Sequence, residues 1–148
     1  MDDIQSISIG GERIHFKYEM RDIFQLKFYP DNPRIASIII RKKGEVVDDD
    51  FIDGKLWENN STHRLKRNIE DHGGLQHPII VHGNWVIEGN TRLCCFRHLY
   101  DETKDEKWRK INCQVLVQEL SKKQVNLLLG NEHIVGKIEW IPSKKDVG

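Results

Sequence analysis

The five residues from Glu88 to Arg92 are the part of this 148-residue chain whose types and order best suit a chemical role. Gly89 permits a left-handed backbone or a close approach to a ligand. Asn90, Thr91 and Arg92 then supply two short polar side chains and a guanidinium where a helix is expected to begin. The first N–H groups of a helix lack backbone partners and lie at the positive end of its dipole. The sequence therefore predicts a phosphate-binding turn at this point.

Each of these side chains also has a purely structural interpretation. The fork of Arg92 suits phosphate oxygens, but it could instead form a salt bridge with Glu88. Gly89 could be an ordinary turn glycine, and Asn90 or Thr91 could simply cap the helix. Glu88 is the candidate catalytic residue, since a carboxylate beside a phosphate can act as a general base or hold Mg²⁺. At the end of a strand it could equally face solvent.

Composition and charge restrict the kinds of protein that this chain can be. Apolar residues make up 38% and charged residues 31% of the sequence, which is typical of one soluble globular domain over residues 1–148. No run approaches the roughly 18 apolar residues of a membrane helix, and no signal peptide is recognisable, so we expect a cytoplasmic protein without a membrane partner. A net charge of zero weighs against electrostatic binding of nucleic acid by the whole domain.

The thiols and imidazoles predict no metal site. An odd number of cysteines, two of them adjacent, fits a reducing compartment. Cys94 and Cys95 fall early in a helix that should pack closely on a sheet, so we expect buried, unreactive thiols. The spacings of the relevant histidines and cysteines match no common zinc pattern; these residues are His72, His77, His82, Cys94, Cys95 and Cys113.

The first third of the chain alternates apolar and polar residues. This pattern predicts a β-hairpin over about residues 4–20 that turns at Gly10-Gly11, followed by a strand from Phe24 to Phe28. Residues 41–60 are polar and charged, and we interpret them as an inserted loop. Ile38-Ile39-Ile40, just before it, fits either a short strand or a turn of helix.

The remaining elements follow from capping residues and from apolar spacing. A helix should begin at Ser61 or Thr62 and stop at Gly73 or Gly74, and a capping box should start another helix at Ser121. The other expected elements are strands over 78–82 and 85–88, a helix over 91–100, a charged loop over 101–110, a strand over 111–117 and an end of the last helix at Gly130.

Several short segments together, in their order along the chain, are specific enough to indicate a family, although no single one of them is. They are Asn32-Pro33-Arg34, Ile69-Glu70-Asp71-His72-Gly73-Gly74-Leu75-Gln76, Pro78-Ile79-Ile80-Val81, Val86-Ile87-Glu88-Gly89-Asn90-Thr91-Arg92-Leu93 and Leu129-Gly130-Asn131-Glu132-His133. In this order they resemble the N-terminal domain of the partition protein ParB and the wider ParB/sulfiredoxin superfamily, over roughly residues 22–140.

The resemblance implies an α+β domain with a small mixed sheet flanked by helices. In that superfamily the Gly-x-x-Arg turn holds nucleotide phosphates: partition proteins bind and hydrolyse CTP, sulfiredoxin uses ATP, and other members are serine kinases or nucleases. It therefore implies a nucleoside triphosphate, CTP or ATP, with Mg²⁺ at Gly89 to Arg92. By the same resemblance, Arg34, Asn131, His133 and Lys137 would close around the phosphates. Asn131 could instead cap a turn, and His133 could be a surface residue.

Departures from the family pattern bear on the activity. Asn90 stands where sulfiredoxin needs a cysteine, so sulfur repair is not expected. Partition proteins carry Glu-Arg-Arg after the glycine, whereas here only Arg92 is kept, and the segment from Gly130 to Ile134 lacks the arginine of their later box. The sequence stops where a partition protein would begin its helix-turn-helix, so DNA binding of the partition type is not expected. The main hypothesis is a nucleotide-dependent switch or weak phosphohydrolase. The alternatives are a DNA-associated or protein-partner module of a plasmid or phage system with a degraded pocket, and a nuclease or kinase using Glu88.

Overall fold

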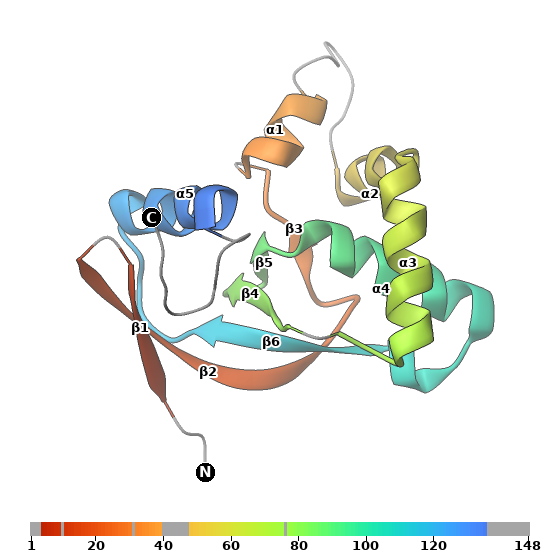
Figure 1. The fold of residues 1–148 in the computed structure, drawn as a ribbon, viewed down its shortest axis with the longest axis horizontal. Coiled ribbons are helices and arrows are strands. Elements are labelled where there is room, and N and C mark those ends of the chain that lie inside the picture. The colour runs from red at the N-terminus through yellow and green to blue at the C-terminus, as the bar shows by residue number, and fades with distance from the viewer. Residues whose placement is uncertain (1–3, 10, 31, 40–47, 76, 136–148) are drawn as a thin grey trace. The chain divides into compact units, whose positions relative to one another are not determined.

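The structure, a computed structural model, describes residues 4–9, 11–30, 32–39, 48–75 and 77–135 (Figure 1). The strands are β1 (Gln5–Ile9), β2 (Glu12–Asp22), β3 (Lys27–Phe28), β4 (Ile79–His82), β5 (Trp85–Glu88) and β6 (Lys110–Leu116). The helices are α1 (Pro33–Ile39), α2 (Asp49–Trp57), α3 (Asn60–His72), α4 (Asn90–Thr103) and α5 (Lys122–Val135), with a 3-10 turn, η1, at Glu106–Trp108. The strands form one mixed sheet in the order β1-β2-β6-β4-β5-β3, which confirms a mixed α+β fold.

One compact unit comprises residues 1–17 and 116–148. Its described part contains the predicted hairpin, in which Ile7 of β1 lies opposite Ile14 of β2 in antiparallel register. The capping box of α5 is confirmed, because the Ser121 N–H donates to Gln124 Oε1 at 3.0 Å and the Gln124 N–H donates to Ser121 Oγ at 3.1 Å. The helix continues to Val135, so the predicted end at Gly130 is wrong. A glycine inside a helix costs only about 1 kcal/mol and need not stop it.

The second compact unit comprises residues 18–115. The predicted hairpin of β4 and β5 is confirmed, and Gly83 has a φ of +63° in its turn. β4 also pairs in parallel with β6, and β3 pairs in parallel with β5. These pairings bring the ends of β5 and β3 to the starts of α4 and α1, the two connections that matter for the candidate site.

Helix α4 lies at the centre of the second unit, and α2 and α3 pack against it (Figure 1). One side of α4 is apolar because Leu93, Phe96 and Leu99 recur at helical spacing, and all three are buried. They join a single core with residues of the strands and the other helices. The largest fully buried side chains elsewhere in this unit are Ile23, Leu26, Phe28, Ile35, Ile79, Ile87 and Ile111.

The predicted loop over residues 41–60 is wrong in its second half, since residues 49–57 form α2. Residues 41–47 lie outside the described part. The Asp48 carboxylate caps the helix by accepting the Phe51 N–H at 2.9 Å. Ile52 and Leu56, four residues apart, are both buried against the core. The run of acids suggested a loop, but acids favour the first turn of a helix.

Other predicted boundaries also moved. The strand expected from Phe24 to Phe28 is only Lys27–Phe28, because the Asp22 carboxylate accepts the Phe24 N–H at 2.8 Å and bends the chain into a turn. Helix α3 is capped by Asn59 rather than by Ser61 or Thr62, and Gly73 ends it in the left-handed conformation as predicted. Ile38 and Ile39 belong to helix α1.

The helix predicted over 91–100 begins one residue earlier and extends three residues further, to Thr103. The expected charged loop over 101–110 accordingly contains the end of α4 and the turn η1, which Asp105 caps. No helix in the described ranges is both long and apolar enough to cross a bilayer.

Candidate functional site

The turn between β5 and α4 has the backbone that the sequence predicted, for a different immediate reason. Gly89 has a φ of +109° and is the N-cap residue of α4; its carbonyl accepts the Leu93 N–H at 3.0 Å. A Cβ added to Gly89 would lie 2.3 Å from Cγ2 of Ile79. Glycine is therefore required because α4 starts directly against β4. Within the described residues no side chain caps this helix, which leaves its first N–H groups for solvent or a ligand.

Arg92 is held by protein groups on the side of β4. Its Nη1 donates to the His77 carbonyl at 3.1 Å and lies 3.5 Å from the Pro78 carbonyl, and its Nη2 lies 3.8 Å from Glu88 Oε2. The salt-bridge interpretation of Arg92 is the arrangement observed. The same pairing engages Glu88, the candidate catalytic acid, whose side chain is half-buried.

Two asparagine side chains connect the start of α4 to the chain leading into α1. Asn32 Nδ2 donates to the Ile87 carbonyl at 2.9 Å, and Asn90 Oδ1 accepts the Tyr29 N–H at 3.3 Å. Asn90 is buried, and its Nδ2 has no hydrogen-bond partner among the described residues. A buried amide without a partner costs about 1–3 kcal/mol, so this donor requires an explanation.

Thr91 opens onto a cavity of about 630 Å³ in which the starts of two long helices meet. Asn59, Ser61 and Thr62 of the first turn of α3 line it, and Thr91 comes from the first turn of α4. Lys55 of α2 adds a cation whose Nζ lies 3.5 Å from Glu58 Oε2. The remaining lining residues are Ser37, Leu56 and Leu65. The Ser61 and Thr62 hydroxyls donate to Asn59 Oδ1 and to the Leu56 carbonyl, each at 2.7 Å. The cation and the two helix starts are therefore the features that suit an anionic ligand.

Arg92 lines a different and smaller cavity, of about 260 Å³, beside α3 and the chain that leads into β4. Its other lining residues are Leu65, Asn68, Ile69, His72, Gly74, Leu75 and His77. Thr91 and Arg92 are adjacent in sequence but line different cavities. The predicted set Gly89 to Arg92 therefore does not converge on one point in this conformation.

The residues that the family resemblance added are only partly described. Arg34 lies in α1, and Asn131 and His133 lie in α5, but the positions of their side chains are outside the described part. Lys137 lies wholly outside it. Their approach to a nucleotide stays a prediction.

Sequence reasoning missed the contribution of Lys55 and Asn59, because both fell inside the region assigned as a loop. The available signal was the helix pattern itself. Asp48 precedes an apolar pair at i and i+4, Ile52 and Leu56, which indicates one amphipathic helix. Once α2 is recognised, Lys55 falls one residue before the buried Leu56 and close to the start of the next helix.

The three cysteines are buried, as expected for unreactive thiols. Burial raises the pKa of the Cys95 thiol to about 12, and burial likewise raises the pKa of Cys113 to about 12. Burial and the neighbouring Asp53 carboxylate raise the pKa of Cys94 far above its ordinary value. The start of α4 thus activates neither of its thiols as a nucleophile.

The chain matches no protein-family model, and no curated protein or solved structure matches it significantly. The resemblance to ParB and sulfiredoxin stays a prediction that rests on the ordered segments.

Proposed function

We propose that this protein binds a nucleotide, with the phosphates in the cavity between the starts of α3 and α4. One observation carries the proposal: Thr91, Ser61 and Lys55, from three different helices, line the same cavity. Its volume of about 630 Å³ falls within the roughly 300–1,000 Å³ of small-molecule sites. The ordered segments that resemble the ParB/sulfiredoxin superfamily point to the same ligand class.

Two helix N-termini, rather than one, favour an anion in this cavity. Helices α3 and α4 have 13 and 14 residues, so both have fully developed N-terminal dipoles. In α4 no described side chain caps the first N–H groups, and Thr91 of the same turn lines the cavity. A phosphate accepts several such bonds at once, and charge-assisted bonds are stronger than neutral ones.

In this proposal Arg92 positions the turn and does not grip the phosphate. Its guanidinium is bound to the His77 carbonyl and lies close to Glu88, on the side of the turn facing the smaller cavity. Direct contact with phosphate, as the family resemblance implies, would require Arg92 to leave these partners. Because Glu88 is paired with Arg92, a role as general base is not part of the proposal.

Calorimetry on the whole chain tests the proposal with CTP, ATP and GTP, each with and without Mg²⁺. We expect one of the three nucleotides to bind. Lys55→Ala and Thr91→Val should each weaken its affinity about tenfold or more, because each variant removes a side chain that would contact the charged phosphates. Lys66→Ala is the matched control. Lys66 also lies on a helix of this unit, but its Nζ pairs with Glu102 at 3.0 Å, away from the cavity.

Three outcomes separate the possible sources of binding. Displacement of the nucleotide by tripolyphosphate would assign the affinity to the phosphates, as proposed. Displacement by a DNA oligonucleotide at low salt, lost in Lys55→Ala, would assign the cavity to a nucleic-acid backbone instead. If no nucleotide gives heat, or if Lys55→Ala and Lys66→Ala behave alike, the cavity is not a nucleotide site.

A further inference from the structure

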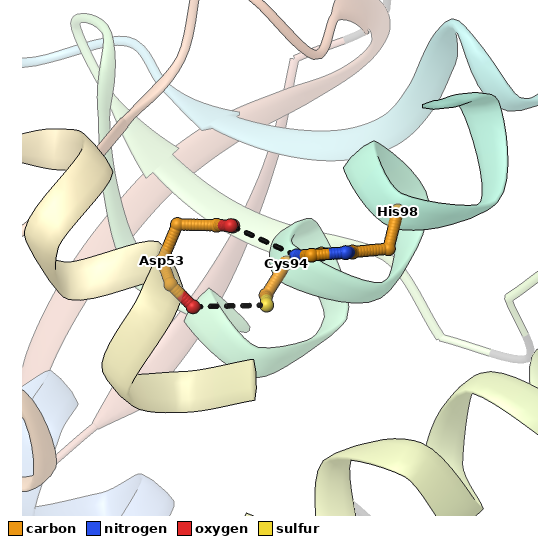
Figure 2. Close-up of side chains that lie close together, drawn as sticks. All are labelled: Asp53, Cys94 and His98. Atoms are coloured by element: carbon orange, nitrogen blue, oxygen red, sulfur yellow. Dashed lines mark hydrogen bonds and ion pairs between the residues drawn. The ribbon is translucent and has the colours of Figure 1, made fainter. Parts of the chain in front are cut away.

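Three metal-ligating side chains converge between α2 and α4, one turn beyond the start of α4 (Figure 2). Asp53 comes from α2, and Cys94 and His98 come from α4. One ligand atom from each residue lies within 4.8 Å of the others. His98 Nε2 is 2.9 Å from Asp53 Oδ2, and Cys94 Sγ is 3.7 Å from the Asp53 carbonyl oxygen. In Figure 2 the imidazole nitrogen and the sulfur both face Asp53.

The helical spacing explains why this set can form. Residues four apart lie on one face of a helix, so Cys94 and His98 present their side chains side by side. Two ligands at this spacing on one helix are a common basis for a metal site. Packing of α2 against α4 then supplies the third ligand, Asp53, which no sequence spacing could have indicated.

A buried polar atom at this place lacks a partner. Asp53 Oδ2 pairs with His98, but Oδ1 is buried and has no hydrogen-bond partner among the described residues. A carboxylate oxygen in this state is costly, because burial removes its water without replacing it. A cation bound at the cluster would satisfy it.

We propose that Asp53, Cys94 and His98 bind a Zn²⁺ ion. A tetrahedral ion with bonds of about 2.0–2.3 Å holds its ligand atoms roughly 3.3–3.6 Å apart. Binding therefore draws the widest pair together by about 1 Å and opens the 2.9 Å pair of Asp53 and His98 slightly. Three protein ligands leave the fourth position of the ion for water or another small ligand.

The ligand set selects the metal and argues against a nucleophilic triad. One sulfur, one imidazole nitrogen and one carboxylate oxygen suit zinc, whereas Mg²⁺ and Ca²⁺ take oxygen ligands almost alone. In a cysteine–histidine–acid triad the imidazole bridges the other two groups through its two different nitrogens. Here one nitrogen of His98 lies within 4.8 Å of both the Cys94 sulfur and an Asp53 carboxylate oxygen, as ligands around an ion do.

Neighbouring groups fix the orientation of the imidazole and leave the cluster accessible to an ion from solvent. The Trp57 ring stacks on His98 with 3.9 Å between centroids and 6° between planes, which fixes the orientation of the ligand. Cys94 is fully buried, whereas the side chains of Asp53 and His98 are 21% and 24% exposed. An ion can therefore enter from the Asp53 and His98 side and meet the sulfur at the inner end.

The binding step balances as a simple exchange. The S–H bond of Cys94 breaks, the S–Zn bond forms, and the proton is released to solvent. The Asp53 carboxylate binds the ion in place of its hydrogen bond to His98. That imidazole exchanges the Nε2–H proton of this hydrogen bond, through solvent, for a proton on Nδ1 and then binds the ion through Nε2. Neither an oxidant nor a reductant is needed.

The test titrates Zn²⁺, and Co²⁺ as a spectroscopic substitute, into the reduced whole chain. We expect one equivalent to bind, a raised melting temperature, and a thiolate-to-cobalt charge-transfer band. Cys94→Ala should abolish the band and weaken binding by more than the roughly 10- to 100-fold cost of losing a residue that supports a ligand. Cys95→Ala is the matched control. Its Sγ lies 3.4 Å from the Thr62 carbonyl, on the side of α4 that faces α3, so this variant should keep both band and affinity.

Two further variants keep the test decisive if Cys94→Ala folds poorly. Asp53→Asn preserves the shape of the side chain and removes its charge, so it should weaken Zn²⁺ binding with unchanged circular dichroism. Trp57→Leu should weaken it by about tenfold. The proposal is overturned if the wild-type chain takes up no zinc, if Cys94→Ala and Cys95→Ala bind equally, or if Asp53→Asn binds as tightly as the wild type.

Discussion

The first and second turns of α4 carry two polar regions that differ in how they are built. At the first turn, Gly89 to Arg92, the features that suggested a ligand are local in the sequence: a glycine, short polar residues and a helix start. At the second turn, Cys94 and His98 become a possible metal site only because α2 packs across them with Asp53. Consecutive residues were thus enough to suggest an anion site, whereas the ligand cluster between two helices could be found only from their packing.

The two regions also differ in which of their groups are engaged. At the first turn the charged residue that looked most functional, Arg92, already bonds to backbone carbonyls. At the second turn Cys94, which looked like mere packing, lies beside Asp53, whose buried Oδ1 lacks a partner in the described part of the chain. Residue type alone therefore did not indicate which buried polar atoms lack a partner among the described residues.

The largest loss of stability is expected from Gly89→Ala, which changes the first region alone. The new Cβ would lie 2.3 Å from Ile79 Cγ2 on a backbone with positive φ. Strain and overpacking together should lower the free energy of unfolding by about 4 kcal/mol. Gly83→Ala is the control, since Gly83 also has positive φ but a Cβ there meets nothing within 4 Å. Denaturant unfolding that gave equal losses for both variants would contradict the close approach of α4 to β4.

Ile52→Ala should affect both regions together, because α2 supplies a residue to each. Ile52 is 2% exposed, and truncating a buried isoleucine costs about 3 kcal/mol. We expect lower stability and, at temperatures where the protein is folded, weaker binding of both zinc and nucleotide. Asp50→Ala, on the exposed face of α2, should change neither binding nor stability beyond about 0.5 kcal/mol. Loss of only one of the two ligands would show that α2 does not support the regions jointly.

Asn32→Ala should loosen the first region and spare the second. The Asn32 amide donates to the buried Ile87 carbonyl at 2.9 Å, and its removal leaves that carbonyl without this donor. We expect a loss of about 2 kcal/mol in unfolding free energy. Nucleotide affinity should fall as the β5–α4 turn is freed from the chain leading into α1, while zinc affinity stays at the wild-type value. Asn68→Ala, at an exposed position of α3, is the control.

The smallest effect is a pH dependence away from both regions. Burial tends to raise the pKa of Asp22, but the Phe24 N–H and the Arg109 guanidinium outweigh it, so the pKa in the folded protein is lowered. A lowered pKa means that the carboxylate stabilises the fold above its unfolded pKa and loses this effect as the pH falls through the folded value. Asp22→Asn should therefore flatten the dependence of stability on pH below about pH 4. Unchanged steepness in Asp22→Asn would argue against the pair with Arg109.

Sequence patterns predicted those parts of the fold whose causes are local. The hairpin of β4 and β5 follows from a Gly-Asn turn between two apolar runs, and both reciprocal bonds of the capping box at Ser121 and Gln124 are present. Helix α2 was missed because its acidic first turn resembles a loop, although Ile52 and Leu56 already stand at helical spacing in the sequence. The observed boundaries differ from the predicted ones where a side chain accepts a hydrogen bond from a backbone N–H, as Asp22 does from Phe24.

The sequence by itself determined the left-handed turn at Gly89 and the helix that begins after it, because backbone sterics and helix ends act over a few residues. Only the tertiary structure decided what each side chain of that helix meets. Packing against β4 placed Arg92 on backbone carbonyls, and packing of α2 and α3 formed the cavity beside Thr91. The same packing brought Asp53 to Cys94 and His98. Contacts between distant segments depend on how whole faces fit together, which no local spacing encodes.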